Sequence, residues 1–266
     1  MKNLLILIAV LAVASAKSID IDPSQVQPFE SIGIGWSQVQ PIEDSDQYWD
    51  RLPADLQYLR KQDPDRRIVN GQEATLGQFP YQVFVDYQRN GGSYSCGGSI
   101  LNSNNVLTAA HCVWRAEGGI VIAGAHNRRI EEPTQQRIPF AKVYYHADYT
   151  EQRFRNDIAV VRLIRHITFN NRVQPVLLPA LGDNQCLAVW GNPESIQDQN
   201  LCLSTAGETS TCQGDSGGPL TVMDGGRTMQ VGIVSFGHSS GCVSKYPKVF
   251  ARVTYYLDWI LHVLIL

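Results

Sequence analysis

The chain has 266 residues, of which 44% are hydrophobic and 18% are charged, and its formal net charge is −3. This composition is typical of a globular protein and excludes collagen, coiled coils and extended disorder. The net charge does not indicate a polycationic surface that would bind nucleic acid. The sequence contains no run of 18 apolar residues, so it predicts no membrane-spanning helix. We therefore expect neither nucleic acid nor a membrane as a partner.

The first 67 residues differ from the remainder in charge. They carry seven Lys/Arg and ten Asp/Glu, whereas residues 68–266 carry fifteen of each.

The first 16 residues have the pattern of a secretory signal peptide. This pattern consists of a positive charge at Lys2, an apolar run over residues 4–13 and the small residues Ala14-Ser15-Ala16. The alternative is a buried N-terminal helix. Secretion would place the six cysteines in an oxidising compartment, where an even count predicts disulfides.

Residues 17–67 contain five prolines and no cysteine. Such a segment is either a linker or a removable pro-segment. It ends in Arg66-Arg67, directly before the apolar pair Ile68-Val69, and a basic pair before an apolar start is typical of a processing site. The sequence therefore predicts a pro-segment over residues 17–67 of a secreted, extracellular protein.

From residue 68 onward the chain has the pattern of an all-β protein. Short runs rich in β-branched residues are separated by clusters of Gly, Asn and Pro. The clearest runs are residues 81–85, 120–123, 158–163 and 230–235. Strands at this spacing predict a barrel or a sandwich, and the apolar stretch 255–266 predicts a terminal amphipathic helix.

Three short motifs carry groups suited to catalysis. Small residues surround His111 in Leu107–Cys112, Asp157 opens an apolar strand, and glycines flank Ser216 in Cys212–Leu220. A carboxylate at a buried strand start needs donors such as a histidine N–H, and glycines beside a serine allow close approach of a substrate carbonyl. Taken alone, the histidine and the aspartate are more often structural.

The serine motif also fits Gly-x-Ser-x-Gly, the nucleophile elbow of α/β-hydrolases. In that fold the chain order is serine, acid, histidine, whereas here it is His111, Asp157, Ser216. No histidine after Ser216 stands beside an acidic partner. The α/β-hydrolase interpretation is therefore rejected.

With these motifs in this order, residues 68–266 resemble the chymotrypsin/trypsin-like serine proteases. The start Ile68-Val69-Asn70-Gly71 also resembles the family, which normally has two glycines after Ile-Val. The resemblance implies an all-β fold of two six-stranded antiparallel β-barrels, a short C-terminal helix and a site between the barrels. It further implies a secreted zymogen that becomes a serine endopeptidase, with protein or peptide substrates.

The resemblance assigns a role to each motif. Ser216 is implied as the nucleophile, His111 as the general base and then acid, and Asp157 as the group that orients the histidine. The N–H groups of Gly214 and Ser216 are implied as the oxyanion hole.

Activation is implied by the same resemblance. Cleavage after Arg67 by an activating protease of tryptic preference would free the amine of Ile68, which is expected to pair with the carboxylate of Asp215 and order the oxyanion loop. Protein inhibitors are further expected partners. No metal or cofactor is expected, because the histidines show no ligand spacing with cysteines or carboxylates.

The family also implies how the cysteines pair, although sequence alone allows fifteen connectivities for six of them. The implied disulfides are Cys96–Cys112, Cys186–Cys202 and Cys212–Cys242.

By resemblance, Ser210 forms the base of the pocket for the residue before the scissile bond, and Ser235, Gly237 and Lys248 belong to its walls. A neutral base argues against cleavage after Lys or Arg and favours a chymotrypsin-like pocket. Lys248 stands where the family commonly has a small residue. Two alternatives remain for its ammonium. It either repels basic side chains of the substrate and pairs with acidic ones, or it extends to solvent so that the lysine only narrows the pocket.

The chain departs from the family between Pro179 and Cys186, which only six residues separate. Roughly three dozen residues, about two strands with their connections, are expected to be missing from the second barrel. Either the protein is a shortened variant or the gene's exons have been assembled incorrectly. If the gap is genuine, the alternative function is a catalytically impaired relative that acts as a binding or regulatory protein.

Overall fold

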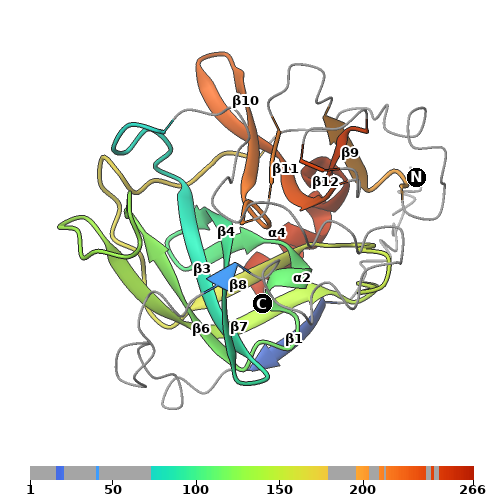
Figure 1. Cartoon of the computed structure of the whole chain (residues 1–266), viewed down its shortest axis with the longest axis horizontal. Coiled ribbons are helices and arrows are strands. Elements are labelled where there is room, and N and C mark those ends of the chain that lie inside the picture. Colours follow the sequence, from blue (N-terminus) through green and yellow to red (C-terminus); the bar gives the residue numbers. More distant parts are fainter. Residues whose placement is uncertain are drawn as a thin grey trace, which may run out of the picture.

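The computed structural model of the chain describes residues 73–178, 196–203, 210–212, 214–237, 241–242 and 246–266, together with the backbone of two short strands in the N-terminal segment. This part of the chain is mostly β, as predicted, and forms two sheets and a C-terminal helix (Figure 1). Four positions singled out above lie outside the described residues: Arg67, Ile68, Pro179 and Cys186.

Six strands of the first sheet form a closed barrel. In order around the barrel they are β3 (Gln82–Arg89), β4 (Gly92–Asn102), β5 (Asn105–Thr108), β8 (Ala159–Leu163), β7 (Gln136–His146) and β6 (Gly118–Ala123). Each neighbouring pair is antiparallel, and the pairing of β7 with β8 closes the ring. Closure gives each of these six strands a neighbour on both sides along part of its length, which satisfies many of their backbone groups.

Side-chain alternation explains why these segments are strands. In β3, the side chains of Val83, Val85 and Tyr87 belong to the main hydrophobic core, whereas Phe84 packs against a smaller cluster with Ile122. Successive residues of a strand point to opposite faces, so each face of β3 finds its own apolar partners. The predicted runs at 81–85, 120–123 and 158–163 all fall in strands of this barrel, to within one residue.

The second sheet contains four described strands. Their order is β10 (Pro219–Asp224), β11 (Arg227–Phe236), β12 (Lys248–Arg252) and β9 (Asn200–Leu203), all antiparallel. Gly225 and Gly226, both at positive φ, form the two-residue turn between β10 and β11, as such a hairpin requires. The described second half is thus a sheet rather than a second six-stranded barrel, as the shortened sequence led us to expect.

The C-terminal segment packs back onto the barrel. The 3₁₀ turn η5 (Val253–Tyr256) leads into the helix α4 (Leu257–Ile265), whose Trp259, Ile260 and Val263 join the main core. The guanidinium of Arg162 in β8 donates to the carbonyl of Val263 at 3.0 Å, which satisfies an orphan acceptor at the end of the helix. The predicted terminal helix is therefore confirmed.

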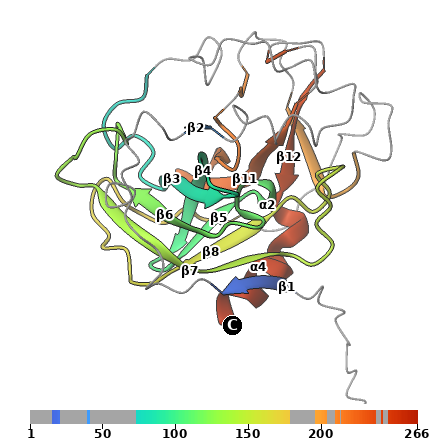
Figure 2. The same cartoon turned by 60° about the horizontal axis from the view of Figure 1, so that its bottom comes forward.

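Two further strands come from the N-terminal segment. β1 (Ala16–Asp20) pairs antiparallel with β7 over five positions, and the two strands lie side by side in Figures 1 and 2. β2 (Gln40–Pro41) pairs in parallel with Tyr94 and Ser95 of β4. Neither strand was predicted, because a five-residue strand without apolar alternation carries no periodic signal.

No helix within the described segments is long and apolar enough to cross a membrane.

Candidate active site

The helix α2 (Ala110–Val113) positions His111 at the point where β5 ends. The backbone N–H of His111 donates to Oδ1 of Asp157 at 2.8 Å, and Nδ1 of its ring lies 2.7 Å from Oδ2 of the same carboxylate. A carboxylate can only accept, so Nδ1 carries the hydrogen of the neutral ring. Nε2 is then the acceptor, which is the state that a general base requires.

Asp157 is held at the start of β8 by a turn. The preceding residue, Asn156, has φ +52°, a conformation that asparagine tolerates better than most residues. The hydroxyl of Tyr256 donates to the Asn156 side chain at 3.1 Å and anchors this turn to the C-terminal segment. Asp157 itself is 1% exposed. Its carboxylate accepts a third hydrogen bond, from the hydroxyl of Ser235 at 2.6 Å, so its buried charge is well satisfied.

Arg89 and Phe154 also contact His111. The buried guanidinium of Arg89 donates to the carbonyls of His111 (3.3 Å) and Trp114 (3.1 Å), which lie at the end of the short helix α2. The ring of Phe154 meets the imidazole edge-on, with 5.4 Å between the ring centroids. Together they restrict the orientation of His111.

The serine segment packs against the same region. The N–H of Gly97 in β4 donates to the carbonyl of Ser216 at 2.7 Å, and the N–H of Gly217 donates to Val234 in β11 at 2.9 Å. Gly217 has φ +76°, and a Cβ there would lie 2.6 Å from the carbonyl oxygen of Gly97 and 3.2 Å from Sγ of Cys112. Only glycine fits this contact, which brings the nucleophile's loop against the histidine turn.

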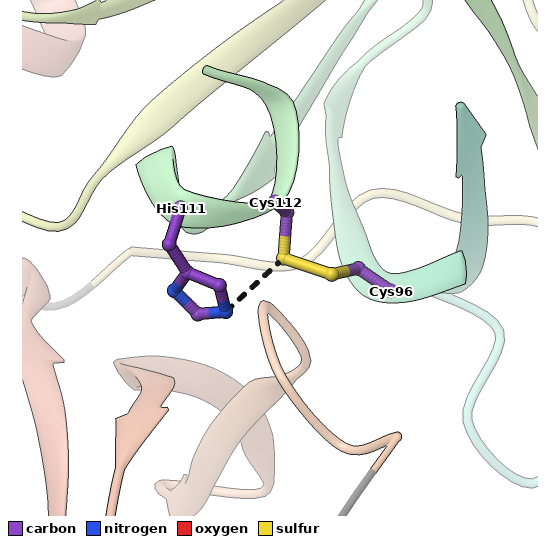
Figure 3. A group of neighbouring side chains, drawn as sticks. All are labelled: Cys96, His111 and Cys112. Carbon is purple, nitrogen blue, oxygen red and sulfur yellow. Dashed lines mark hydrogen bonds between the residues drawn. A yellow bond between two sulfur atoms is a disulfide. The ribbon is translucent and has the colours of Figure 1, made fainter. Parts of the chain in front are cut away.

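The Cys96–Cys112 disulfide lies directly beside the imidazole (Figure 3). Nε2 of His111 is 3.6 Å from Sγ of Cys112, so the three residues have the spacing of a metal-ligand set. Cysteine binds a metal ion as a thiolate, and both of these sulfurs are held in a disulfide. The cluster is therefore a clamp on the histidine turn rather than a metal site.

The other cysteines follow the pairing that the resemblance implies, as far as the structure describes them. Cys212 is bonded to Cys242. Cys202 is also disulfide-bonded, and its partner lies outside the described residues, as Cys186 does.

The loop before the nucleophile is a tight turn closed by Asp215. The N–H of Cys212 donates to Oδ2 of Asp215 at 2.9 Å, and the N–H of Asp215 donates to the carbonyl of Cys212 at 3.1 Å. Gly214, between them in the turn, has φ +84°. The N–H of Gly218 donates to the carbonyl of Asp215 at 3.0 Å, which fixes the backbone on the other side of Ser216.

The residues assigned to the specificity pocket are buried or half-buried. Ser210 is buried, and its hydroxyl donates to the carbonyl of Thr211. The side chain of Lys248, at the start of β12, lies inside the protein rather than in solvent, and its Nζ donates to the carbonyl of Gly241 at 3.4 Å. Burial lowers the pKa of the Lys248 ammonium to about 8, an effect opposed by the carboxylate of Asp215.

Sequence reasoning missed three contributors to this site. It placed Ser235 in a pocket wall, whereas the structure directs the Ser235 hydroxyl at Asp157. It did not identify Arg89 or Phe154, because neither stands in a motif and both reach the histidine through tertiary packing. Arg89 ends β3 close to the polar Asp86 and Gln88, so no local pattern marks it as buried.

A closed antiparallel barrel beside a second sheet, with an aspartate–histidine pair on one and a serine loop on the other, defines a chymotrypsin-like fold and site. The family model "Trypsin" matches residues 68–199 and 178–260. These two matches overlap over residues 178–199, which contain the shortened stretch after Pro179.

Curated relatives and a solved structure agree with this class. Trypsin-1 of Astacus astacus is 34% identical, with 73% of this chain and 98% of the relative covered. Chymotrypsin of Phaedon cochleariae is 35% identical (74% and 82% covered), and brachyurin of Leptuca pugilator is also 35% identical (73% and 96% covered). The solved structure of HL collagenase is 28% identical with a TM-score of 0.67, covering 74% of this chain and 99% of its own. The chain belongs to the trypsin family of chymotrypsin-like serine proteases.

Proposed function

We propose that the chain is the precursor of a secreted serine endopeptidase. Residues 1–16 form its signal peptide, residues 17–67 its pro-segment and residues 68–266 its protease domain. The observation that carries the proposal is the pair of hydrogen bonds from His111 to Asp157, one from the backbone N–H and one from Nδ1, which leaves Nε2 as an acceptor. Nε2 lies 3.6 Å from Sγ of Cys112, the same sulfur that Gly217 of the serine loop approaches closely.

In the proposed reaction, the hydroxyl of Ser216 attacks the carbonyl carbon of a peptide bond while Nε2 of His111 accepts its proton. The resulting imidazolium is stabilised by Asp157, whose carboxylate is already aligned at 2.7 Å from Nδ1. The N–H groups of Gly214 and Ser216 donate to the oxyanion. His111 then protonates the leaving amine, and water hydrolyses the acyl-enzyme by the reverse proton path.

Activation requires cleavage between Arg67 and Ile68 by a protease that cuts after arginine. The new amine of Ile68 then pairs with Asp215, whose carboxylate already closes the turn before the nucleophile. A buried carboxylate is strongly stabilised by such a cation, so the pair fixes the backbone of Gly214 and Ser216 in the orientation that the oxyanion needs. Protein inhibitors that bind the proposed active site are further expected partners.

Controlled cleavage tests this proposal. The secreted precursor is treated with trypsin, the trypsin is then blocked with a trypsin-specific inhibitor, and hydrolysis of a mixed peptide library is followed by mass spectrometry. We expect activity after cleavage, and a loss of about 1000-fold or more in Ser216→Ala, as for other nucleophile deletions. Arg67→Gln should remain inactive, because trypsin can still cut after Arg66 but cannot free the amine of Ile68.

The shortened stretch between Pro179 and Cys186 favours one alternative, a secreted binding or regulatory relative without activity. A processed, folded protein whose turnover equals that of its Ser216→Ala variant would support this alternative and contradict the protease.

A further inference from the structure

A buried ammonium lies beside the serine loop, and the proposed reaction does not use it. Lys248 is 8% exposed and begins β12, an inner strand of the second sheet that pairs with both β11 and β9. Burying an ammonium costs free energy unless an anion compensates it. The position of Lys248 therefore calls for an explanation in terms of its partners.

The neighbours of the ammonium place it next to the catalytic groups. A Cβ at Gly237 would lie 2.5 Å from Nζ of Lys248, so the absence of a side chain there makes room for the ammonium. Gly237 is two residues beyond Ser235, whose hydroxyl binds Asp157. The charge of Asp215, the residue before Ser216, also acts on Lys248. The Lys248 ammonium therefore lies close to two segments of the site: the one that contains Ser235 and the one that contains Ser216.

The charge balance changes when the precursor is activated. Before cleavage, the carboxylate of Asp215 is the group that favours the charged form of Lys248. In the activated protease the amine of Ile68 takes that carboxylate as its partner. Among the described residues, the hydrogen-bond acceptor that then remains to Lys248 is the neutral carbonyl of Gly241, at 3.4 Å. A buried cation in this situation favours binding of a new anion.

We propose that Lys248 determines substrate specificity and that the activated protease prefers peptides with glutamate or aspartate before the scissile bond. The inference rests on the proposed function, because the pocket has a role only if peptides are cleaved. Ser210 is neutral and buried, so it offers no carboxylate to a basic side chain. An arginine or lysine of the substrate would meet the Lys248 ammonium and be repelled.

The test compares three matched substrates that differ only in having Glu, Leu or Arg before the scissile bond. For the activated wild type we expect kcat/KM for Glu to exceed that for Leu, with Arg the poorest. In Lys248→Met, which keeps the length of the side chain, the Glu-to-Leu ratio should fall roughly 10- to 100-fold, as loss of a charged hydrogen bond implies. Lys248→Asp should reverse the order of Glu and Arg.

A control variant and a pH series separate this effect from general damage. Lys142→Met removes a lysine from β7 in the barrel and should leave the ratio unchanged. The wild-type Glu-to-Leu ratio should fall with rising pH as the Lys248 ammonium loses its proton. Burial lowers the pKa of Lys248 to about 8 while Asp215 still opposes the effect, so the fall in the activated protease should begin below that pH. Any effect of pH on the chemical step that both substrates share cancels in the ratio.

The failure of this inference can be distinguished from failure of the proposed function. If the wild type cleaves the Leu substrate and the Glu-to-Leu ratio is the same in Lys248→Met, the specificity role is wrong and the protease stands. If Arg is the preferred substrate, the role of Lys248 is likewise overturned. If no substrate is cleaved and a serine-directed phosphonate labels nothing, the proposed function fails, and this inference with it.

Discussion

At the scale of single residues, the buried carboxylate of Asp157 is the centre of the site. It accepts from the backbone and ring of His111 and from the hydroxyl of Ser235. The third bond holds Oδ2 where the ring needs it. Its donor, Ser235, comes from β11 in the second sheet, whereas His111 follows β5 of the barrel. Both halves of the molecule therefore donate hydrogen bonds to Asp157.

Replacing Ser235 with alanine tests this contribution. We expect kcat/KM to fall about tenfold, because one hydrogen bond to a charged acceptor contributes about 1.5–3 kcal/mol. Ser103→Ala is the matched control, since the Ser103 hydroxyl contacts His166 instead and its removal should leave kcat/KM unchanged. Equal losses in the two variants, measured with the same peptide substrate, would contradict a positioning role for Ser235.

At the scale of elements, the short helix α2 carries His111, the proposed general base. Four residues are too few for a helix to be stable alone, so its geometry depends on external partners. The Cys96–Cys112 disulfide holds one side of the turn, and Arg89 binds the carbonyls of His111 and Trp114. Nε and Nη2 of Arg89 are buried without a hydrogen-bond partner, so this guanidinium is costly to bury.

Arg89→Met should therefore affect catalysis more than folding. We expect kcat to fall about 3- to 10-fold, since about 1 kcal/mol of positioning is lost, while KM stays unchanged. The melting temperature should change little, because an apolar side chain replaces an incompletely paired buried cation. Arg115→Met, at an exposed position of the same turn, is the control. A large drop in melting temperature with unchanged kcat would show that Arg89 is only structural.

At the scale of the whole molecule, the site exists only where the barrel meets the second sheet. Gly97 in β4 binds the carbonyl of Ser216, and the hydroxyl of Tyr81 contacts that of Thr221 in β10 at 3.1 Å. Ser99 in β4 also donates to the Gln230 side chain in β11. These contacts align the histidine turn with the serine loop. Because they depend on the second sheet, shortening of the second half affects the geometry of the site.

Much of this arrangement could be predicted from the sequence, and the remainder depends on tertiary contacts. The order of the three motifs, together with the family that they resemble, singled out His111, Asp157 and Ser216. Taken alone, the histidine and the aspartate would have been interpreted as structural. The hydroxyl direction of Ser235 follows from how β11 pairs with β12, which no local pattern encodes. The long strand β4 was not predicted because its glycines and serines have low strand propensity, and its pairing with β3 and β5 overrides that preference.

Labelling of Ser216 tests the central claim most directly. The precursor and the chain cleaved after Arg67 are exposed to a serine-directed phosphonate, and the modified residue is located by peptide mass spectrometry. We predict a single covalent adduct, on Ser216, that forms rapidly after cleavage, far more slowly before it, and at least 100-fold more slowly in His111→Ala, because the base is lost. A processed and folded chain that gains no adduct on Ser216, or gains it equally fast without His111, would contradict the account.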